Sequence, residues 1–240
     1  MRLASLLSGG KDSVYSIQLS LEQGHDVTHA VTIFPEREDS YMFHVPNLWL
    51  TRLQALAMGL VHVRRGSSGE KEKELSDLVD ALSGLDIDGV VAGAIASTYQ
   101  YSRVSRVCEE LSLEVIAPLW GSDSGSILER VLGAGYRVMV VGVYADGLGE
   151  EWLGRVIDGE AIRELREIGR RRGIALSFEG GEAETLVLGC PIFDGEIRVE
   201  SAESRWQVCR GEYLIREASL AGGSGADQRF EEGISLQQAQ

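Results

Sequence analysis

The first stretch of the chain whose residue types suit chemistry is "LLSGGKDSVY", residues 6–15. It places two glycines, a lysine, an aspartate and two serines directly after an apolar run. Gly9 and Gly10 let the backbone approach a ligand closely, because no Cβ stands in the way. Backbone N–H groups at the start of a helix lack an internal partner and favour negative charge. Lys11 adds a cation, so this stretch predicts an anion-binding loop.

Asp12 is the unexpected member of this loop, because a carboxylate repels an anion. It fits if it orients a loop amide or holds Mg²⁺ beside the anion. The stretch fails the pattern G-x-x-x-x-G-K-[ST], since Ser5 stands where the first glycine belongs and Asp12 follows Lys11. It also fails G-x-G-x-x-G.

Residues 8–13 match S-G-G-x-D-S and resemble the PP-loop of the N-type ATP pyrophosphatases, which split ATP between its α and β phosphates. The resemblance implies that ATP is a substrate and that Mg²⁺ accompanies it. It further implies nucleotide-binding roles for Ser8, Gly9, Gly10, Lys11, Asp12 and Ser13. Lys11 and Asp12 would be catalytic, and Asp12 would be the metal ligand.

The elements expected to position this loop alternate between apolar strands and helices. Strands are predicted at 2–7, 26–34, 60–63, 89–95 and 114–120, and helices at 11–23, 46–59, 70–84 and 98–112. Strands without a polar face are typical of a parallel sheet with helices on both faces. Residues 1–121 therefore predict a Rossmann-like α/β domain, which the PP-loop resemblance places in the adenine nucleotide α-hydrolase type. Ligands of such sheets bind at the carboxyl ends of the strands, where residues 8–13 fall.

After residue 121 the pattern changes. A helix is predicted at 122–135, a strand at 136–145 and a helix at 159–172 that ends at Gly173, followed by β-like segments at 174–178, 184–193 and 196–220. Residues 122–221 therefore predict a smaller α+β domain that shares a cleft with the first. The polar, glycine-rich residues 222–240 predict a flexible tail.

The composition narrows the classes of function. The formal net charge of −14 disfavours nucleic acid as the main ligand, because such proteins usually carry a basic field. No apolar run is long enough to span a bilayer, and the start of the chain does not resemble a signal peptide, so we expect a cytoplasmic protein with no membrane partner. Cys108, Cys190 and Cys209 form no C-x-x-C motif and are expected to be small core residues.

Three further stretches, "MFHVPNLWLTRLQALAMG" (42–59), "GAIASTYQYSRVSRVCEELSLEVIAPLW" (93–120) and "EGGEAETLVLGCPIF" (179–193), resemble the signature blocks of the diphthine–ammonia ligase family, in its archaeal form. This resemblance implies ATP-dependent amidation of diphthine on translation elongation factor 2 by ammonium. The reaction would pass through an acyl-adenylate and yield diphthamide, AMP and pyrophosphate. A homodimer is compatible with the sequence, which leaves the oligomeric state open.

The second block supplies further candidates in the light of that resemblance. Gly93 would leave room for the nucleotide at the end of the fourth strand. Ser97, Tyr101 and Arg103 would face the phosphates or the substrate. Tyr101 and Arg103 read equally as an ordinary helix surface, and Arg106 shares the face of Arg103 and could turn inward in its place.

The turn "GGEAETL" (180–186) is the second candidate site. Side chains two apart in an extended chain point to one side, so Glu182 and Glu184 are predicted to act together as catalytic carboxylates. They could bind the quaternary ammonium of diphthine, capture ammonium, remove its proton or hold Mg²⁺. Thr185 could bind a phosphate or an adenosine hydroxyl, and Ala183 stands where the family has an aromatic residue. The alternative without a catalytic role is a charged turn followed by a strand with a solvent-exposed face.

Two residues of the first block receive weaker interpretations. His44 could reach the nucleotide or be a structural histidine, and Trp49 is assigned no role. Two other functions stay open at this stage. One is a tRNA thiolase with the same loop, disfavoured by the acidic charge and the missing cysteine pair. The other is a module that binds ATP or AMP without turnover, disfavoured by Lys11 and Asp12.

Overall fold

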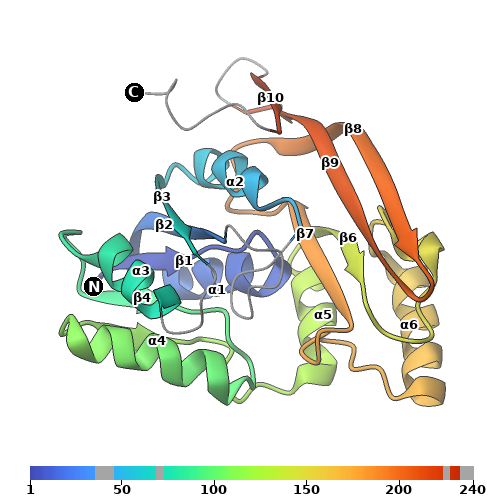
Figure 1. Cartoon of the computed structure of the whole chain (residues 1–240), viewed down its shortest axis with the longest axis horizontal. Helices are drawn as coiled ribbons and strands as arrows, with labels where there is room; N and C mark the ends of the chain where they lie inside the picture. The colour runs from blue at the N-terminus through green and yellow to red at the C-terminus, as the bar shows by residue number, and fades with distance from the viewer. Residues whose placement is uncertain (36–45, 69–72, 224–227, 233–240) are drawn as a thin grey trace.

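The computed structural model describes residues 1–35, 46–68, 73–223 and 228–232 (Figure 1). The first half of the chain contains β1 (Arg2–Leu6), α1 (Lys11–Glu22), β2 (Asp26–Pro35), the short 3-10 helix η1 (Leu48–Leu50), α2 (Thr51–Ala57), β3 (Val61–Ser67), α3 (Lys73–Leu82), β4 (Gly89–Val91), α4 (Thr98–Glu110) and β5 (Glu114–Ile116). Its strands form a five-stranded parallel sheet in the order β3-β2-β1-β4-β5. The order reverses between β1 and β4, so a ligand is expected at the carboxyl ends of these two strands.

Both faces of this sheet are buried, as the uniformly apolar strands predict. Leu3 of β1 belongs to a core cluster with Val14 of α1 and with side chains of α5. Its neighbour Ala4 belongs to a second cluster with Leu78 of α3 and Val107 of α4. Successive residues of one strand thus contact helices on opposite faces, which confirms the predicted α/β class.

The second half contains α5 (Ser124–Gly133), β6 (Arg137–Val143), the 3-10 helix η2 (Glu150–Trp152), α6 (Gly159–Arg172), β7 (Ala183–Gly189), β8 (Glu196–Gln207), β9 (Arg210–Ala221) and β10 (Gln228–Glu231). Its strands form an antiparallel sheet in the order β10-β9-β6-β7, and β8 pairs with β9. The long β8–β9 hairpin, orange to red, lies on the upper right of the view (Figure 1). On β6, Val140 shares a core cluster with Leu165 of α6, whereas Met139 shares one with Leu53 of α2.

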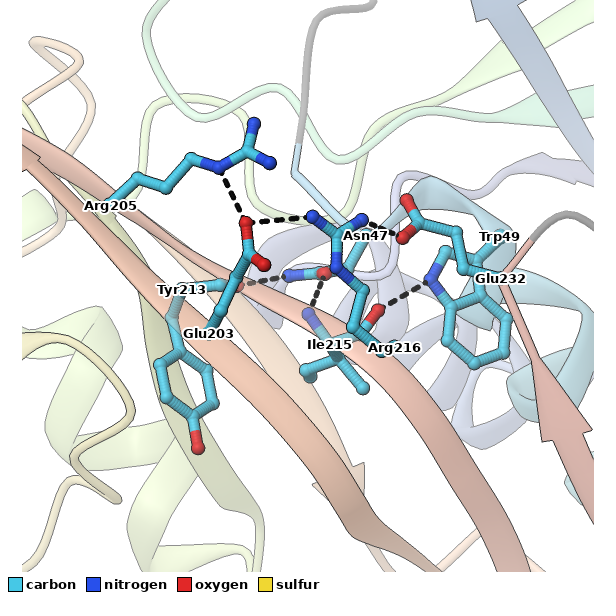
Figure 2. Close-up of polar contacts among 8 residues, drawn as sticks. All are labelled: Asn47, Trp49, Glu203, Arg205, Tyr213, Ile215, Arg216 and Glu232. Carbon is cyan, nitrogen blue, oxygen red and sulfur yellow. Dashed lines mark hydrogen bonds and ion pairs between the residues drawn. The ribbon is translucent and has the colours of Figure 1, made fainter.

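A side-chain amide joins the two halves of the chain (Figure 2). Asn47 donates from Nδ2 to the carbonyl of Tyr213 at 2.8 Å and accepts from the N–H of Ile215 at 2.8 Å. Trp49 donates from Nε1 to the carbonyl of Ile215 at 3.2 Å. These bonds satisfy the backbone of β9 between its pairing with β6 at residues 211–212 and its pairing with β10 at residues 217–220. The segment before α2 is therefore fixed by a partner 166 residues away.

Several predicted element bounds were wrong, for physical reasons that lie in such contacts. The helix predicted at 46–59 begins only at Leu48, because Asn47 has a left-handed φ of 66° where it reaches β9. The β-like segment predicted at 174–178 instead forms turns, with the Phe178 N–H donating to the Ala175 carbonyl at 3.0 Å. The flexible tail predicted at 222–240 contains strand β10, in which Phe230 pairs with Ala218 of β9.

Candidate active site

A cavity of about 320 Å³ lies at the carboxyl edge of the first sheet. Its lining combines the loop after β1, the segment after β4, and strand β7 with the turn that precedes it: Leu6, Leu7, Ser8, Gly10, Lys11, Asp12, Ser13, Val31, Ile33, Leu48, Ala92, Gly93, Ala94, Ser97, Gln100, Val104, Phe178, Glu179, Gly181, Ala183, Glu184 and Thr185. Both halves of the chain therefore contribute to one space at the reversal of strand order.

Hydrogen bonds of two serines stabilise the loop after β1. Gly9 has a φ of +89°, a conformation that side-chain-bearing residues rarely adopt. The Ser13 hydroxyl donates to the Gly10 carbonyl at 3.1 Å and accepts from the Ser8 N–H at 3.3 Å and the Ser8 hydroxyl at 3.1 Å. The two serines thus brace the loop across its base, and the start of α1 faces the cavity as the sequence predicts for an anion site.

Lys11 is buried, with 2% of its surface exposed. Its Nζ donates to Asp12 Oδ2 at 2.7 Å and to the carbonyl of Ser177 at 2.5 Å, and it lies 5.7 Å from the centre of the Phe178 ring. Its backbone N–H donates to Thr185 Oγ1 at 3.2 Å. In this structure Thr185 therefore binds the loop itself, where the sequence suggested a phosphate or an adenosine hydroxyl.

Asp12 and Glu179 place two carboxylates in the cavity. Glu179 accepts a hydrogen bond from the Ala96 N–H at 3.2 Å, which ties the turn before β7 to the segment after β4. Burial, and then the charge of Asp12, raise the pKa of Glu179 above its usual value. Glu179 is not among the site residues predicted from the sequence, although it opens the acidic stretch that contains Glu182 and Glu184.

Among the cavity residues, Asp12 is suited to bind Mg²⁺. Asp12 Oδ1 is buried and accepts no hydrogen bond from any residue that the structure describes, as expected of an oxygen available to a cation. Within the described residues, no group of three His, Cys, Asp or Glu side chains is arranged to hold a metal. Mg²⁺ commonly takes one or two carboxylates and completes its shell with phosphates and water. Asp12 would therefore supply one ligand and the nucleotide others.

The period-two spacing predicts that Glu182 and Glu184 share one environment, but in the structure they do not. Glu184 lies in β7 opposite Gly142 of β6 and lines the cavity. Burial raises the pKa of Tyr144; the charge and the hydrogen bond of Glu212 raise it further, followed by the charge of Glu184. Glu182 precedes the strand, is absent from the cavity lining, and accepts from the Ala175 N–H at 3.1 Å. Glu184 thus faces the ligand space, whereas Glu182 shapes the turn.

The residues that follow β4 also divide between two roles. Ser97 lines the cavity and caps α4, accepting from the Gln100 N–H at 3.3 Å. Gly93 also lines the cavity, but the atoms nearest to it belong to the backbone of α1. A Cβ added to Gly93 would lie 2.9 Å from the Ser13 nitrogen. The missing side chain therefore lets the first turn of α1 approach β4, rather than only leaving room for a nucleotide.

Tyr101 and Arg103 are absent from the cavity lining. The Tyr101 ring stacks on Trp120 with 4.3 Å between ring centres. Arg103 is buried, with its guanidinium 3.9 Å from the carboxylate of Glu74 on α3 and 5.2 Å from the Tyr99 ring centre. The sequence predicted that these two residues face the phosphates or the substrate; in this structure helix packing directs both side chains away from the cavity.

The prediction that all three cysteines are core residues holds for Cys108, which is buried, but Cys190 is half-buried and Cys209 is exposed. Cys108 and Cys190 are both free and belong to or pack against different core clusters. Burial raises the pKa of each thiol to about 11, which keeps it protonated near neutral pH. Trp49 packs at the junction with β9 (Figure 2). His44 lies outside the described residues.

Comparison with known proteins covers nearly the whole chain. The family description "Diphthamide synthase N-terminal domain" matches residues 1–115, and "Diphthamide synthase C-terminal domain" matches residues 123–221. The diphthine–ammonia ligase of Mus musculus is 32% identical over 227 residues, covering 85% of this chain and 85% of the mouse protein. The chain belongs to the diphthamide synthase family. The PP-loop lies in the part of the chain that matches the N-terminal domain, and the turn before β7 lies in the part that matches the C-terminal domain.

Other relatives agree with this membership. The diphthine–ammonia ligase of Danio rerio is 32% identical and covers 85% of this chain and 88% of the fish protein. That of Schizosaccharomyces pombe is 30% identical over 87% of this chain but only 38% of its own, longer sequence. A solved structure described as a predicted subunit of tRNA methyltransferase from Methanocaldococcus jannaschii has 18% identity and a TM-score of 0.46, with 80% of this chain and 98% of that chain covered, a likeness too distant to carry an argument.

Nothing in the described part of the chain is suited to crossing a bilayer as a helix, because its helices are too short or too polar.

Proposed function

We propose that this chain catalyses the amidation of diphthine on translation elongation factor 2 by ammonium, with ATP converted to AMP and pyrophosphate. The observation that carries the proposal is the shared cavity, in which the PP-loop meets the carboxylates of Glu179 and Glu184. The names of the curated relatives supply diphthine and ammonia as the substrates. The acyl-adenylate follows from the PP-loop, since an activated acid must form before a nitrogen nucleophile can displace its oxygen.

In the first step, an oxygen of the diphthine carboxylate attacks the α-phosphorus and the bond to the bridging oxygen of pyrophosphate breaks. Negative charge then accumulates on the leaving pyrophosphate. Lys11 and the N–H groups at the start of α1 are placed to stabilise that charge. Mg²⁺ held by Asp12 would neutralise further phosphate charge. A preorganised donor of this kind typically lowers the activation free energy by about 3–4 kcal/mol.

In the second step, ammonia attacks the acyl carbon and AMP leaves with the oxygen. Ammonium must lose one proton before the attack and a second as the amide forms. Glu179 and Glu184 are the acceptors that the cavity offers on the side of β7. The raised pKa of Glu179 suits a proton acceptor, because the proton then binds more strongly than it does to an ordinary glutamate.

Lys11 also links the two steps in space. Its ammonium binds the Ser177 carbonyl, and Glu179 follows two residues later. The cation on the pyrophosphate side thus contacts the turn that carries the proton acceptor. This contact supports the proposal that the activated acid and the incoming nitrogen meet in this cavity.

The test is a reconstituted reaction of the purified chain with ATP, Mg²⁺, ¹⁵N-ammonium and elongation factor 2 that carries diphthine. We expect AMP and pyrophosphate in equal amounts and ¹⁵N in the modified histidine by mass spectrometry. Lys11→Met and Asp12→Asn should abolish the amidation while retaining a cooperative melting transition. Arg171→Met, on an exposed stretch of α6, is the matched loss of a cation and should retain activity. Formation of ADP and orthophosphate, or full activity of Lys11→Met, would contradict the proposal.

A further inference from the structure

Gln54 of α2 is fully buried beneath the PP-loop. Its Nε2 donates to the carbonyl of Gly9 at 2.9 Å and to the carbonyl of Val187 in β7 at 2.9 Å. The Gly9 carbonyl also accepts from the Val187 N–H at 3.0 Å. Two donors, one from each half of the chain, therefore fix the direction of a single carbonyl in the loop.

The direction of that carbonyl decides where the next N–H points. The described residues contain no cis peptide bond, so the Gly9 carbonyl and the Gly10 N–H lie on opposite sides of one planar unit. With the carbonyl bound by Gln54 and Val187, the Gly10 N–H must point away from both. Gly10 lines the cavity, and within the described residues its N–H donates to no group. This N–H is therefore a donor left available for a ligand.

The oxygen of the Gln54 amide also lies against the loop. Its Oε1 is buried and has no hydrogen-bond partner among the residues that the structure describes. An added Cβ on Gly9 would lie 3.0 Å from this oxygen, so the amide also leaves no space for a side chain there.

We propose that Gln54 is a positioning residue for the nucleotide, which holds the Gly9–Gly10 peptide so that the Gly10 N–H binds the diphosphate portion of ATP. The inference rests on the nucleotide use in the proposed function and not on diphthine or ammonium. Because Val187 shares the task, the diphosphate site is complete only when β7 is docked against the loop. Gln54 itself touches no reacting atom.

The test compares two ligands that differ in the diphosphate. Binding of α,β-methylene ATP and of AMP is measured by calorimetry for the full chain and for Gln54→Met, which keeps the length of the side chain but cannot donate. We expect the affinity for α,β-methylene ATP to fall at least about tenfold, equivalent to about 1.4 kcal/mol, and that for AMP to change less than about twofold. Equal losses for both ligands, or no loss for either, would overturn the proposal.

Asn47→Asp is the matched control, because Asn47 also uses a side-chain amide to join the two halves of the chain, but at β9. Its loss should affect the two ligands alike, whereas a selective loss for α,β-methylene ATP would show that docking of the two halves, and not Gln54, sets the diphosphate site. A measurement on the unaltered chain covers the case in which Gln54→Met does not fold. In ¹⁵N-glycine-labelled protein, pyrophosphate should shift the Gly10 amide resonance strongly and AMP should not; an unmoved Gly10 resonance would refute the assignment. If the chain binds no nucleotide at all, the proposed function fails as well.

Discussion

Replacing Gly93 by alanine probes how closely β4 must approach the PP-loop. An alanine Cβ would lie 2.9 Å from the Ser13 nitrogen and 3.0 Å from both the Asp12 carbonyl carbon and the Ser13 Cα, against 3.4–4 Å for ordinary contact. All three atoms belong to the backbone of the first turn of α1, so no side chain can rotate out of the way. The loop or the strand must move by roughly half an ångström, the difference between these distances.

Two magnitudes follow from that displacement. Overpacking of this kind costs about 1–3 kcal/mol, and a value near 2 kcal/mol lowers the Tm of a chain of this length by roughly 4–8 °C. A misplacement of about 1 Å in a site can cost about 100-fold in rate, so half of that corresponds to roughly tenfold. We therefore expect Gly93→Ala to lose both stability and about tenfold in turnover.

The assay pairs thermal melting with calorimetric binding of α,β-methylene ATP and with pyrophosphate release. Gly89→Ala is the control for strain, because an added Cβ on this first residue of β4 meets the Glu114 carbonyl oxygen at 2.7 Å, away from the PP-loop. It should lose stability with nucleotide affinity unchanged. Gly133→Ala, which meets nothing within 4 Å, should lose neither. If Gly93→Ala melts early yet binds and turns over like the unaltered chain, the approach of β4 does not position the loop.

Three further predictions concern individual side chains. The raised pKa of Glu179 means that the folded chain binds the Glu179 proton more tightly than the unfolded chain does. The contribution of Glu179 to stability therefore falls as pH rises through the folded-state pKa. The Tm of Glu179→Gln, relative to that of the unaltered chain, should rise from about pH 4 to about pH 7, and a constant difference would exclude the shift. Glu184→Ala should lower turnover by roughly 100-fold in the reconstituted assay, with the affinity for α,β-methylene ATP retained; parallel losses would assign Glu184 to nucleotide binding. Arg103→Met should cost about 3 kcal/mol of stability in denaturant unfolding, because Arg103 is buried beside Glu74, and a selective loss of nucleotide affinity would restore its role at the phosphates.

Local signals in the sequence were sufficient where neighbours along the chain decide the structure. The helix predicted at 159–172 has those bounds, because Asp158 caps its first N–H groups and Gly173 ends it with a φ of 76°. The PP-loop was recognised for the same reason, since a buried strand, two glycines and a helix start form one continuous segment. The uniformly apolar strands likewise determined a parallel sheet covered on both faces.

Only the tertiary structure decided which side chains share the cavity. Glu179 reaches Ala96 across 83 residues, and Gln54 binds Gly9 and Val187 at separations of 45 and 133 residues. Periodicity cannot report such contacts, because it describes the face of an element and not the element opposite. The same limit applies to Arg103: the sequence places it on a helix, but only the tertiary structure shows that its guanidinium packs 3.9 Å from the carboxylate of Glu74. The sequence by itself determined the glycine-rich loop between β1 and α1; the docking of β7 determined what that loop faces.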